Sequence, residues 1–233
     1  NGLRVIEKDI KEVHVVCSGA GAAAIACLDL LVALGMTREN ITVCDSKGVI
    51  YKDRDDKMDA SKQRYAIEDN GQRVLADAVN GRDIFLGLSG PNVLSVDMLK
   101  TMNADPIVLA LANPQPEIWP PEAIAARPDV IIGTGRSDFP NQVNNVLCFP
   151  FIFRGALDVG ATTINEEMKI ACVHAIARMA HVEADAASYG EKSASFGRDY
   201  LIPRPLDQRL ILEIAPAIAQ AAMDSGVATR PIQ

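Results

Sequence analysis

The sequence predicts an α/β fold, a doubly wound parallel sheet followed by a C-terminal helical extension. Short apolar runs alternate along the first 140 residues with segments whose apolar residues recur at helical spacing. The apolar runs show no polar alternation, which is typical of parallel strands that are buried on both faces. Aromatic residues make up only 5% of the chain and alanine is frequent, which favours helices packed on a sheet over a β-sandwich.

The order of the elements follows from these runs. The expected strands are Val13–Cys17, Ile41–Cys44, Ile84–Leu88, Ile107–Ala112 and Val130–Gly133. The expected helices between them are Ala22–Leu34, Arg64–Ala78, Val93–Met102 and Pro121–Ala126. After residue 140 only helices are expected, at Asn145–Val159, Glu166–His181 and Leu206–Ser225. We therefore expect a sheet domain over 1–150 and a helical extension over 151–233, packed on that domain or on a missing catalytic one.

Composition excludes several classes of partner. The 233 residues carry a formal net charge of −7 and a pI near 5.0, which argues against nucleic acid or an anionic membrane as the main partner. No apolar run reaches the roughly 18 residues that span a bilayer, and no signal peptide opens the chain. The five cysteines show no CxxC spacing and are expected to be reduced. These features predict a cytoplasmic protein, and the start at Asn1 without a methionine suggests a fragment or a processed product.

The segment Gly19-Ala20-Gly21-Ala22-Ala23-Ala24 fits the pattern G-x-G-x-x-A between the first strand and the first helix. The first glycine allows a tight turn, the second lets backbone approach a diphosphate, and the small last residue lets helix and strand pack closely. The second strand leads into Asp45, near the spacing of about 20 residues at which an acid binds the adenosine ribose. The alternative is an ordinary β–α turn with a surface aspartate. Together the two features favour a Rossmann-type dinucleotide site.

The choice between NAD and NADP stays open on these residues. Asp45 favours NAD, because a carboxylate accepts the ribose 2′-hydroxyl and repels a 2′-phosphate. A phosphate would instead be attracted by the cations that follow, which are Lys47, Lys52, Arg54 and Lys62. Ordinary solvated charges are the alternative interpretation of Lys47 and Lys62.

Polar loops follow the later strands as well, and ligands of open α/β sheets bind beyond the carboxyl ends of the strands. Ser89 and Gly90 follow the third strand, and Asn113 follows the fourth. Pro114 holds Asn113 in an extended conformation, and its amide could bind a substrate carboxylate or a ribose hydroxyl. An Asn-Pro turn without a ligand is the alternative. Asn141, Asn144 and Asn145 form a second amide cluster just before an expected helix. One of these asparagines could be the N-cap of that helix.

These motifs, taken in order, resemble the cofactor domain of malic enzymes over essentially the whole chain. The segments that carry the resemblance are Val16 to Ala23, Asp45 to Gly48, Ala112-Asn113-Pro114, Asn141 to Pro150 and Phe151 to Asp158. The tail segments Tyr200 to Asp207 and Ser225 to Ile232 resemble the bacterial branch, in which a phosphotransacetylase-like domain often follows.

The resemblance implies an oxidative decarboxylation, in which malate gives pyruvate and carbon dioxide while NAD(P) is reduced. It places Ala20 to Ala23 at the diphosphate, Asn113 near the nicotinamide ribose and malate, and Asn145 at a malate carboxylate. Asp45, Ser46 and Lys47 would face the adenosine ribose. Lys62 falls where NADP-using relatives tend to carry a cation, so NADP is expected, with NAD as the alternative.

The resemblance also implies what the chain lacks. The general base Lys, the acid Tyr and the ligands of the divalent Mg or Mn ion all precede the glycine motif in this family. We therefore expect the chain alone to bind cofactor without turning over malate, and to form a homo-oligomer or to associate with the missing N-terminal portion. Two alternatives stay open: the cofactor domain of a glutamate-type amino-acid dehydrogenase, and a non-catalytic module that senses NAD(P).

Overall fold

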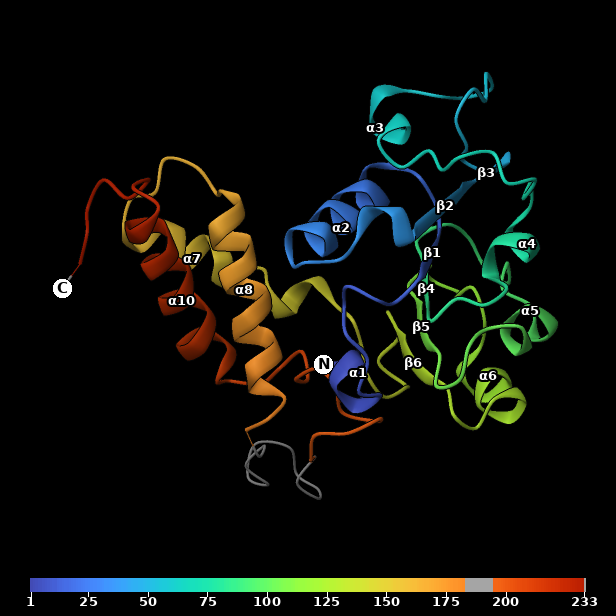
Figure 1. Cartoon of the computed structure of the whole chain (residues 1–233). Helices are drawn as coiled ribbons and strands as arrows, with labels where there is room; N and C mark the ends of the chain where they lie inside the picture. The colour runs from blue at the N-terminus through green and yellow to red at the C-terminus, as the bar shows by residue number, and fades with distance from the viewer. Residues whose placement is uncertain (183–194, 233) are drawn as a thin grey trace. The chain divides into compact units, whose positions relative to one another are not determined.

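The computed structural model describes residues 1–182 and 195–232. Within them, six strands form a single sheet in the order β3-β2-β1-β4-β5-β6 (Figure 1). Five strands are parallel: β1 (Val15–Ser18), β2 (Ile41–Asp45), β4 (Ile84–Gly87), β5 (Ile107–Ala110) and β6 (Ile131–Thr134). The short edge strand β3 (Gly48–Val49) is antiparallel to β2. The expected strands are thus present, with β3 added by a tight turn that apolar periodicity alone does not reveal.

Helices cover both faces of the sheet, as a doubly wound fold requires. Figure 1 shows α2 (Ala22–Ala33) on one face and α4 (Leu75–Val79), α5 (Val96–Lys100) and α6 (Pro120–Ala126) on the other. The short elements α1 (Gly2–Val5), η1 (Arg38–Asn40) and α3 (Ala60–Gln63) complete this part of the chain. The strand order reverses between β1 and β4, because the chain continues from β1 to β2 on one side and returns to β4 on the other.

The core beneath α4, α5 and α6 explains why the strands are apolar without interruption. Val16, Phe85 and Val108 come from three adjacent strands and are fully buried together with Val79 and Leu99 of the covering helices. Burying each such side chain contributes about 1.5–3 kcal/mol to folding. The parallel register aligns these residues directly, since Val16 is opposite Phe85 and Phe85 is opposite Val108.

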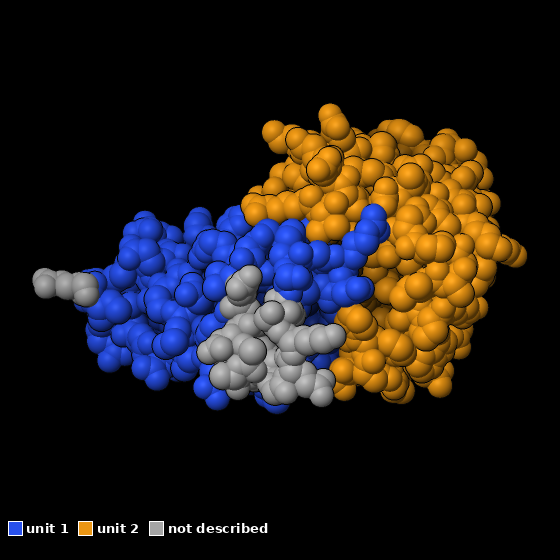
Figure 2. All heavy atoms as spheres, turned by 90° about the horizontal axis from the view of Figure 1, so that it is seen from below, with its two compact units in different colours: residues 1, 141–233 blue, residues 2–140 orange. Residues whose placement is uncertain are grey.

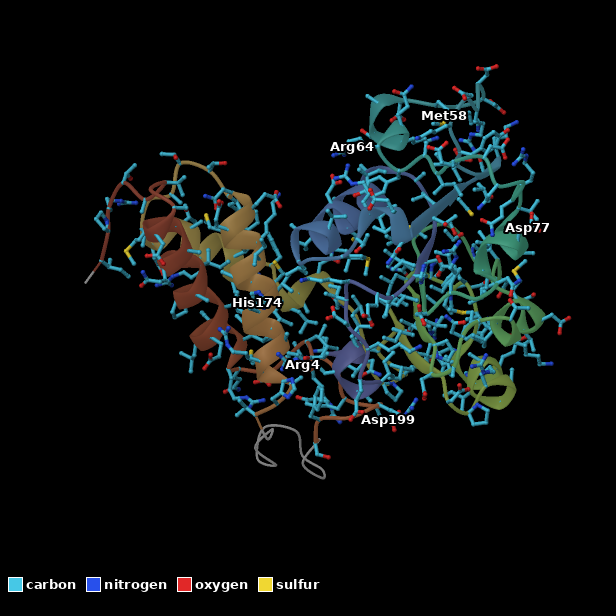
Figure 3. All side chains as sticks on the ribbon, in the orientation of Figure 1. Arg4, Met58, Arg64, Asp77, His174 and Asp199 are labelled. Carbon is cyan, nitrogen blue, oxygen red and sulfur yellow. The ribbon has the colours of Figure 1, made fainter. Side chains whose placement is uncertain are left out.

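The expected helix over Arg64–Ala78 is wrong. The structure has α3 before this range and α4 at its end, with no helix over residues 64–74. Ile67 instead forms a parallel bridge with Tyr51 and exchanges backbone hydrogen bonds with the neighbouring segment. Gly71 has a positive φ of 84°, and the Asp77 carboxylate at the start of α4 (Figure 3) accepts from the backbone N–H groups of residues 73 and 74. These turn and capping bonds replace the helical ones.

A second compact unit contains Asn1 and residues 141–233, and the sheet unit spans Gly2–Pro140 (Figure 2). The elements of the unit that contains residues 141–233, the helical unit, are η2 (Asn145–Leu147), α7 (Phe151–Asp158), α8 (Glu166–Met179) and α10 (Leu210–Asp224). The expected helix over Asn145–Val159 is divided into η2 and α7, with Pro150 immediately before α7, because proline lacks the N–H that a helix interior requires. The helix expected over Glu166–His181 is α8, which ends two residues earlier, at Met179. The helix expected over Leu206–Ser225 is α10, which begins later, at Leu210, and ends at Asp224.

The boundary between the units falls at 140/141, earlier than the expected 150/151. The Asn141 side chain explains the shift, because it donates to the carbonyl of Arg198 at 2.7 Å and accepts from the N–H of Leu201 at 2.8 Å. Leu147 is also buried in the core that α7, α8 and α10 share. Both residues therefore belong to the helical unit and not to the sheet.

Across residues 1–182 and 195–232, no helix has the length and apolar character needed to cross a bilayer.

Gly155 allows α7 and α10 to pack closely. A Cβ atom at this position would lie 2.3 Å from the carbonyl oxygen of Ala215 and 2.7 Å from Cβ of Ile218. Replacing Gly155 with alanine should therefore destabilise the chain by up to about 2 kcal/mol, because an overpacking cost of about 1–3 kcal/mol, at its upper end for a 2.3 Å contact with backbone, exceeds the roughly 1 kcal/mol that alanine gains in helix propensity.

Urea denaturation, followed by circular dichroism, measures this change. Gly197→Ala is the matched control in the same unit, since a Cβ at Gly197 would meet nothing within 4 Å. A Gly155→Ala chain as stable as the unaltered chain would show that the two helices can separate at no cost.

Candidate cofactor site

The glycine turn after β1 brings the carboxyl ends of three strands together. Gly19 has a φ of 121°, a conformation that favours glycine, and its N–H donates to the carbonyl of Cys44 at the end of β2 at 2.8 Å. On the other side, the N–H of Leu88 donates to the carbonyl of Ser18, and the Ser18 and Ser89 hydroxyls are 2.8 Å apart. A Cβ on Gly19 would lie 2.4 Å from the carbonyl oxygen of Leu88, so the turn has no room for a side chain.

The N-terminus of α2 carries the features of an anion site. Gly21 is its N-cap and provides no side-chain hydrogen bond, so the first N–H groups of the helix lack the usual capping acceptor. A Cβ on Gly21 would meet nothing within 4 Å, which means that the backbone here borders open space. Ala24, the small residue of the G-x-G-x-x-A pattern, is buried. The arrangement fits a diphosphate bound at the helix N-terminus.

A pocket of about 800 Å³ opens beside this turn. Its walls come from the ends of β1 and β2, from β3, and from the segments that follow β1, β3 and β4. The lining residues are Ser18, Gly19, Ala20, Gly21, Cys44, Asp45, Ser46, Gly48, Lys57, Lys62, Leu75, Ser89 and Val93. The volume lies in the range typical of cofactor sites.

Asp45 is the centre of a buried ion cluster at the wall of this pocket. Its carboxylate accepts from Nη1 and Nη2 of Arg54 at 3.0 and 2.6 Å and from Nζ of Lys62 at 2.8 Å. The backbone N–H of Lys47 donates to the same carboxylate at 2.9 Å. The side chains of Asp45, Arg54 and Lys62 are only 8%, 6% and 13% exposed. A single carboxylate is therefore neutralised by two cations, which leaves the cluster with a net positive charge.

The protonation of Asp45 follows from these contacts. Burial raises the pKa of this carboxyl, but the hydrogen bonds from Arg54 and Lys62 outweigh burial and hold the pKa well below its usual value. The same pairing raises the pKa of Arg54. Because its folded pKa is lowered, Asp45 contributes stability above its unfolded pKa, and this contribution is lost only as the pH falls through the folded value.

The structure brings many of the predicted cofactor residues together. Gly19, Ala20, Gly21, Asp45, Ser46, Lys62 and Ser89 all line the pocket. The other predicted residues of the sheet unit do not line it: Ala22 and Ala23 begin α2, Lys47 pairs with Asp56 at 3.2 Å, and Gly90 and Asn113 lie on the loops after β4 and β5. Their roles in binding stay predictions.

Asn145, the predicted malate ligand, lies exposed on η2 in the helical unit. Its neighbour Asn144 is the N-cap of η2, with a side chain that accepts from the N–H of Val146 at 3.1 Å. The expectation that one asparagine of this cluster caps a helix is thus met by Asn144, and the carboxylate-binding role of Asn145 stays a prediction.

Two cations of this region were not assigned to the site from the sequence: Lys57 lines the pocket, and Arg54 binds the lining residue Asp45. Arg54 had been noted only as a nearby cation, and its bidentate bond to Asp45 depends on a turn in which Asp53 has a φ of 63°. Lys57, with a φ of 53°, lines the pocket and reaches the Ser46 hydroxyl at 3.3 Å. The density of charges over residues 52–62 was the available signal. Among residues 1–182 and 195–232, no three His, Cys, Asp or Glu side chains are grouped so as to hold a metal ion.

Comparison with known proteins agrees with this geometry. The family described as malic enzyme, NAD binding domain, matches residues 1–189. The NADP-dependent malic enzyme of Haemophilus influenzae is 68% identical over 236 residues, which cover 100% of this chain and 31% of that protein. The NAD-dependent malic enzyme of Rhizobium meliloti is 61% identical, over 100% of this chain and 30% of that protein. The chain therefore spans about a third of the length of these curated relatives.

A solved structure gives the same result. The malic enzyme from Pyrococcus horikoshii matches with a TM-score of 0.87 and 35% identity, over 100% of this chain and 53% of that one. The family match also decides against the glutamate-type amino-acid dehydrogenase. Sequence, fold and cofactor pocket thus agree that the chain belongs to the malic enzyme family, as its NAD-binding domain.

Proposed function

We propose that this chain is the cofactor-binding part of a malic enzyme that prefers NADP and oxidatively decarboxylates malate to pyruvate and carbon dioxide. The observation that carries the proposal is the pocket in which the Gly19 turn and the positively charged Asp45 cluster line one cavity. The turn supplies a place for the diphosphate, and the cluster supplies a place for the adenosine ribose with its 2′-phosphate.

The charges of the cluster support NADP over NAD. An ionised Asp45 alone would repel a 2′-phosphate, but it is paired with both Arg54 and Lys62. The Lys62 ammonium has three N–H donors, and two of them are directed at Asp45 and at the carbonyl of Lys57. Its third donor is left for a ligand. Lys57 adds another positive charge to the pocket wall.

The roles of the chain's residues follow from this placement. The N–H groups at the start of α2 would bind the diphosphate, and Asp45, Ser46 and Lys62 would hold the adenosine ribose and its phosphate. The bound nicotinamide supplies the hydride acceptor for malate oxidation. Asn113 would orient the nicotinamide ribose and the substrate, and Asn145 would bind a malate carboxylate.

The proposal assigns the remaining catalytic groups to another part of the enzyme. The general base, the acid and the ligands of the Mg or Mn ion would come from a part of the enzyme outside these 233 residues. A divalent ion would polarise the keto oxygen and stabilise the enolate as carbon dioxide leaves. Self-association, and a phosphotransacetylase-like domain in the same protein, are further parts of this proposal.

The purified chain should bind NADPH without catalysing malate oxidation. With malate, NADP and Mn²⁺ present, absorbance at the wavelength of the reduced cofactor should stay at the level of the buffer control, because the chain would lack the base and the metal ligands. Turnover near that of a full-length malic enzyme would contradict this assignment. Cofactor-dependent assembly without turnover, measured by light scattering, would favour the sensing module over the enzyme.

Replacing Lys62 with alanine should weaken NADP binding by about ten- to a hundredfold, because a hydrogen bond to a charged group contributes about 1.5–3 kcal/mol. NAD binding should change much less, since NAD lacks the 2′-phosphate. Calorimetric titration of each cofactor measures the two affinities. Lys100→Ala is the control, because Lys100 is exposed and lies on α5 away from the pocket lining. An unchanged ratio of NADP to NAD affinity would remove Lys62 from the specificity argument.

The affinity for NADP should fall as the pH is lowered below about 6, where a phosphate monoester takes up its second proton. The affinity for NAD should stay level over the same range. Asp45 does not titrate in this window, since its pKa is held well below its usual value by Arg54 and Lys62. Titrations between pH 5 and 8 check both curves. A parallel decline of the two affinities would point to a protein group and not to the 2′-phosphate.

A further inference from the structure

Glu117 is a fully buried carboxylate that joins the loops after β4 and β5. It is 0% exposed, and its two oxygens serve different loops. Oε1 accepts from the N–H of Ser89 at 3.1 Å, and Oε2 accepts from the N–H of Ala112 at 3.0 Å. Ser89 lines the cofactor pocket, and Ala112 directly precedes Asn113.

Gly87, the last residue of β4, makes room for this carboxylate. A Cβ on Gly87 would lie 2.4 Å from Cδ of Glu117 and 2.7 Å from each carboxylate oxygen. The backbone of Glu117 is fixed as well, because its carbonyl accepts from the N–H of Leu94 at 3.0 Å. The carboxylate is thus confined between the two strand ends, with one oxygen for each N–H group.

Burying a carboxylate is costly unless its hydrogen bonds are satisfied. Glu117 has backbone N–H partners and no ion pair among the described residues. A carboxylate without a counter-ion costs more to bury than a neutral residue of similar volume, so stability alone does not explain a glutamate at this position. A dinucleotide crosses such a sheet where the strand order reverses, here between β1 and β4. The adenosine half would face β2 and Asp45, which leaves the loops after β4 and β5 for the nicotinamide half.

We propose that Glu117 is a positioning residue that sets the separation of the Ser89 and Asn113 loops and thereby the fit of the nicotinamide half of the cofactor. The inference rests on the proposed cofactor function. It assigns the two halves of the site to different anchors, with Asp45 at the adenosine end and Glu117 at the nicotinamide end.

The test compares two ligands on the same chain. NADPH occupies both halves of the site, whereas 2′,5′-ADP occupies the adenosine half alone. In Glu117→Gln one acceptor oxygen becomes an NH₂ group that faces a backbone N–H. The affinity for NADPH should fall by about tenfold, and the affinity for 2′,5′-ADP should stay within about twofold. Glu122→Gln is the matched control, because Glu122 is exposed in the first turn of α6.

Gly87→Ala is a second variant that reaches the same carboxylate from the other side. Its added methyl group should displace Glu117 and cause the same selective loss of NADPH affinity. In a Glu117→Ala background, where the space is empty, the Gly87→Ala change should have little further effect on NADPH binding. Such non-additivity is specific to residues that act through one contact.

The outcomes separate the two proposals. If the unaltered chain binds neither ligand, the proposed cofactor function fails, and this inference fails with it. If the unaltered chain binds both ligands, the positioning role is overturned when Glu117→Gln and Gly87→Ala lower both affinities equally or leave both unchanged. A selective loss of NADPH affinity in either variant supports it.

Discussion

The close approach of backbone at Gly19 is the constraint on which the rest of the sheet unit depends. The turn accepts no side chain, because the carbonyl of Leu88 occupies the space where a Cβ would lie. This contact fixes the end of β1 against the end of β4, while the N–H of Gly19 holds the end of β2. The pocket, the N-terminus of α2 and Asp45 all adjoin these three strand ends.

Two different kinds of interaction hold the two sides of this region. At the end of β2, Asp45 is held by the cations of Arg54 and Lys62, of which Lys62 lines the pocket. A buried ion pair adds little net stability, since desolvation offsets the attraction between the charges. The second cation of this cluster leaves a positive charge at this side of the pocket. At the ends of β4 and β5, Glu117 binds backbone N–H groups, which fixes loop geometry without presenting charge to the pocket.

The sequence predicted the parts of the fold that local pattern determines. β1, α2 and β2 follow from apolar runs around a glycine turn, and Asp45 follows from its spacing to that turn. The expected helix over Arg64–Ala78 failed because Ile67, Val74 and Leu75 fit helical spacing, while the decisive interactions were the pairing of Ile67 with Tyr51 and the turn at Gly71. Periodicity does not carry information about either. Arg54 and Glu117 were not assigned because only the fold brings them into contact with their partners, and each resembles an ordinary surface charge in the sequence.

The separation of the two anchors has a consequence for how cofactor preference can change. The cations around Asp45 are side chains on the segment after β3, and a substitution there alters charge without moving the Gly19 turn. Glu117 acts on backbone that continues from β4 and β5, so a substitution there disturbs the loops that carry Ser89 and Asn113. The Lys62 side chain is 13% exposed at the pocket wall, so salt weakens its attraction for a phosphate only in part. The hydrogen bonds of the fully buried Glu117 are screened less still. Under the proposed function, discrimination of the 2′-phosphate is the property that substitutions near Asp45 can adjust, and the geometry at the ends of β4 and β5 is the fixed one.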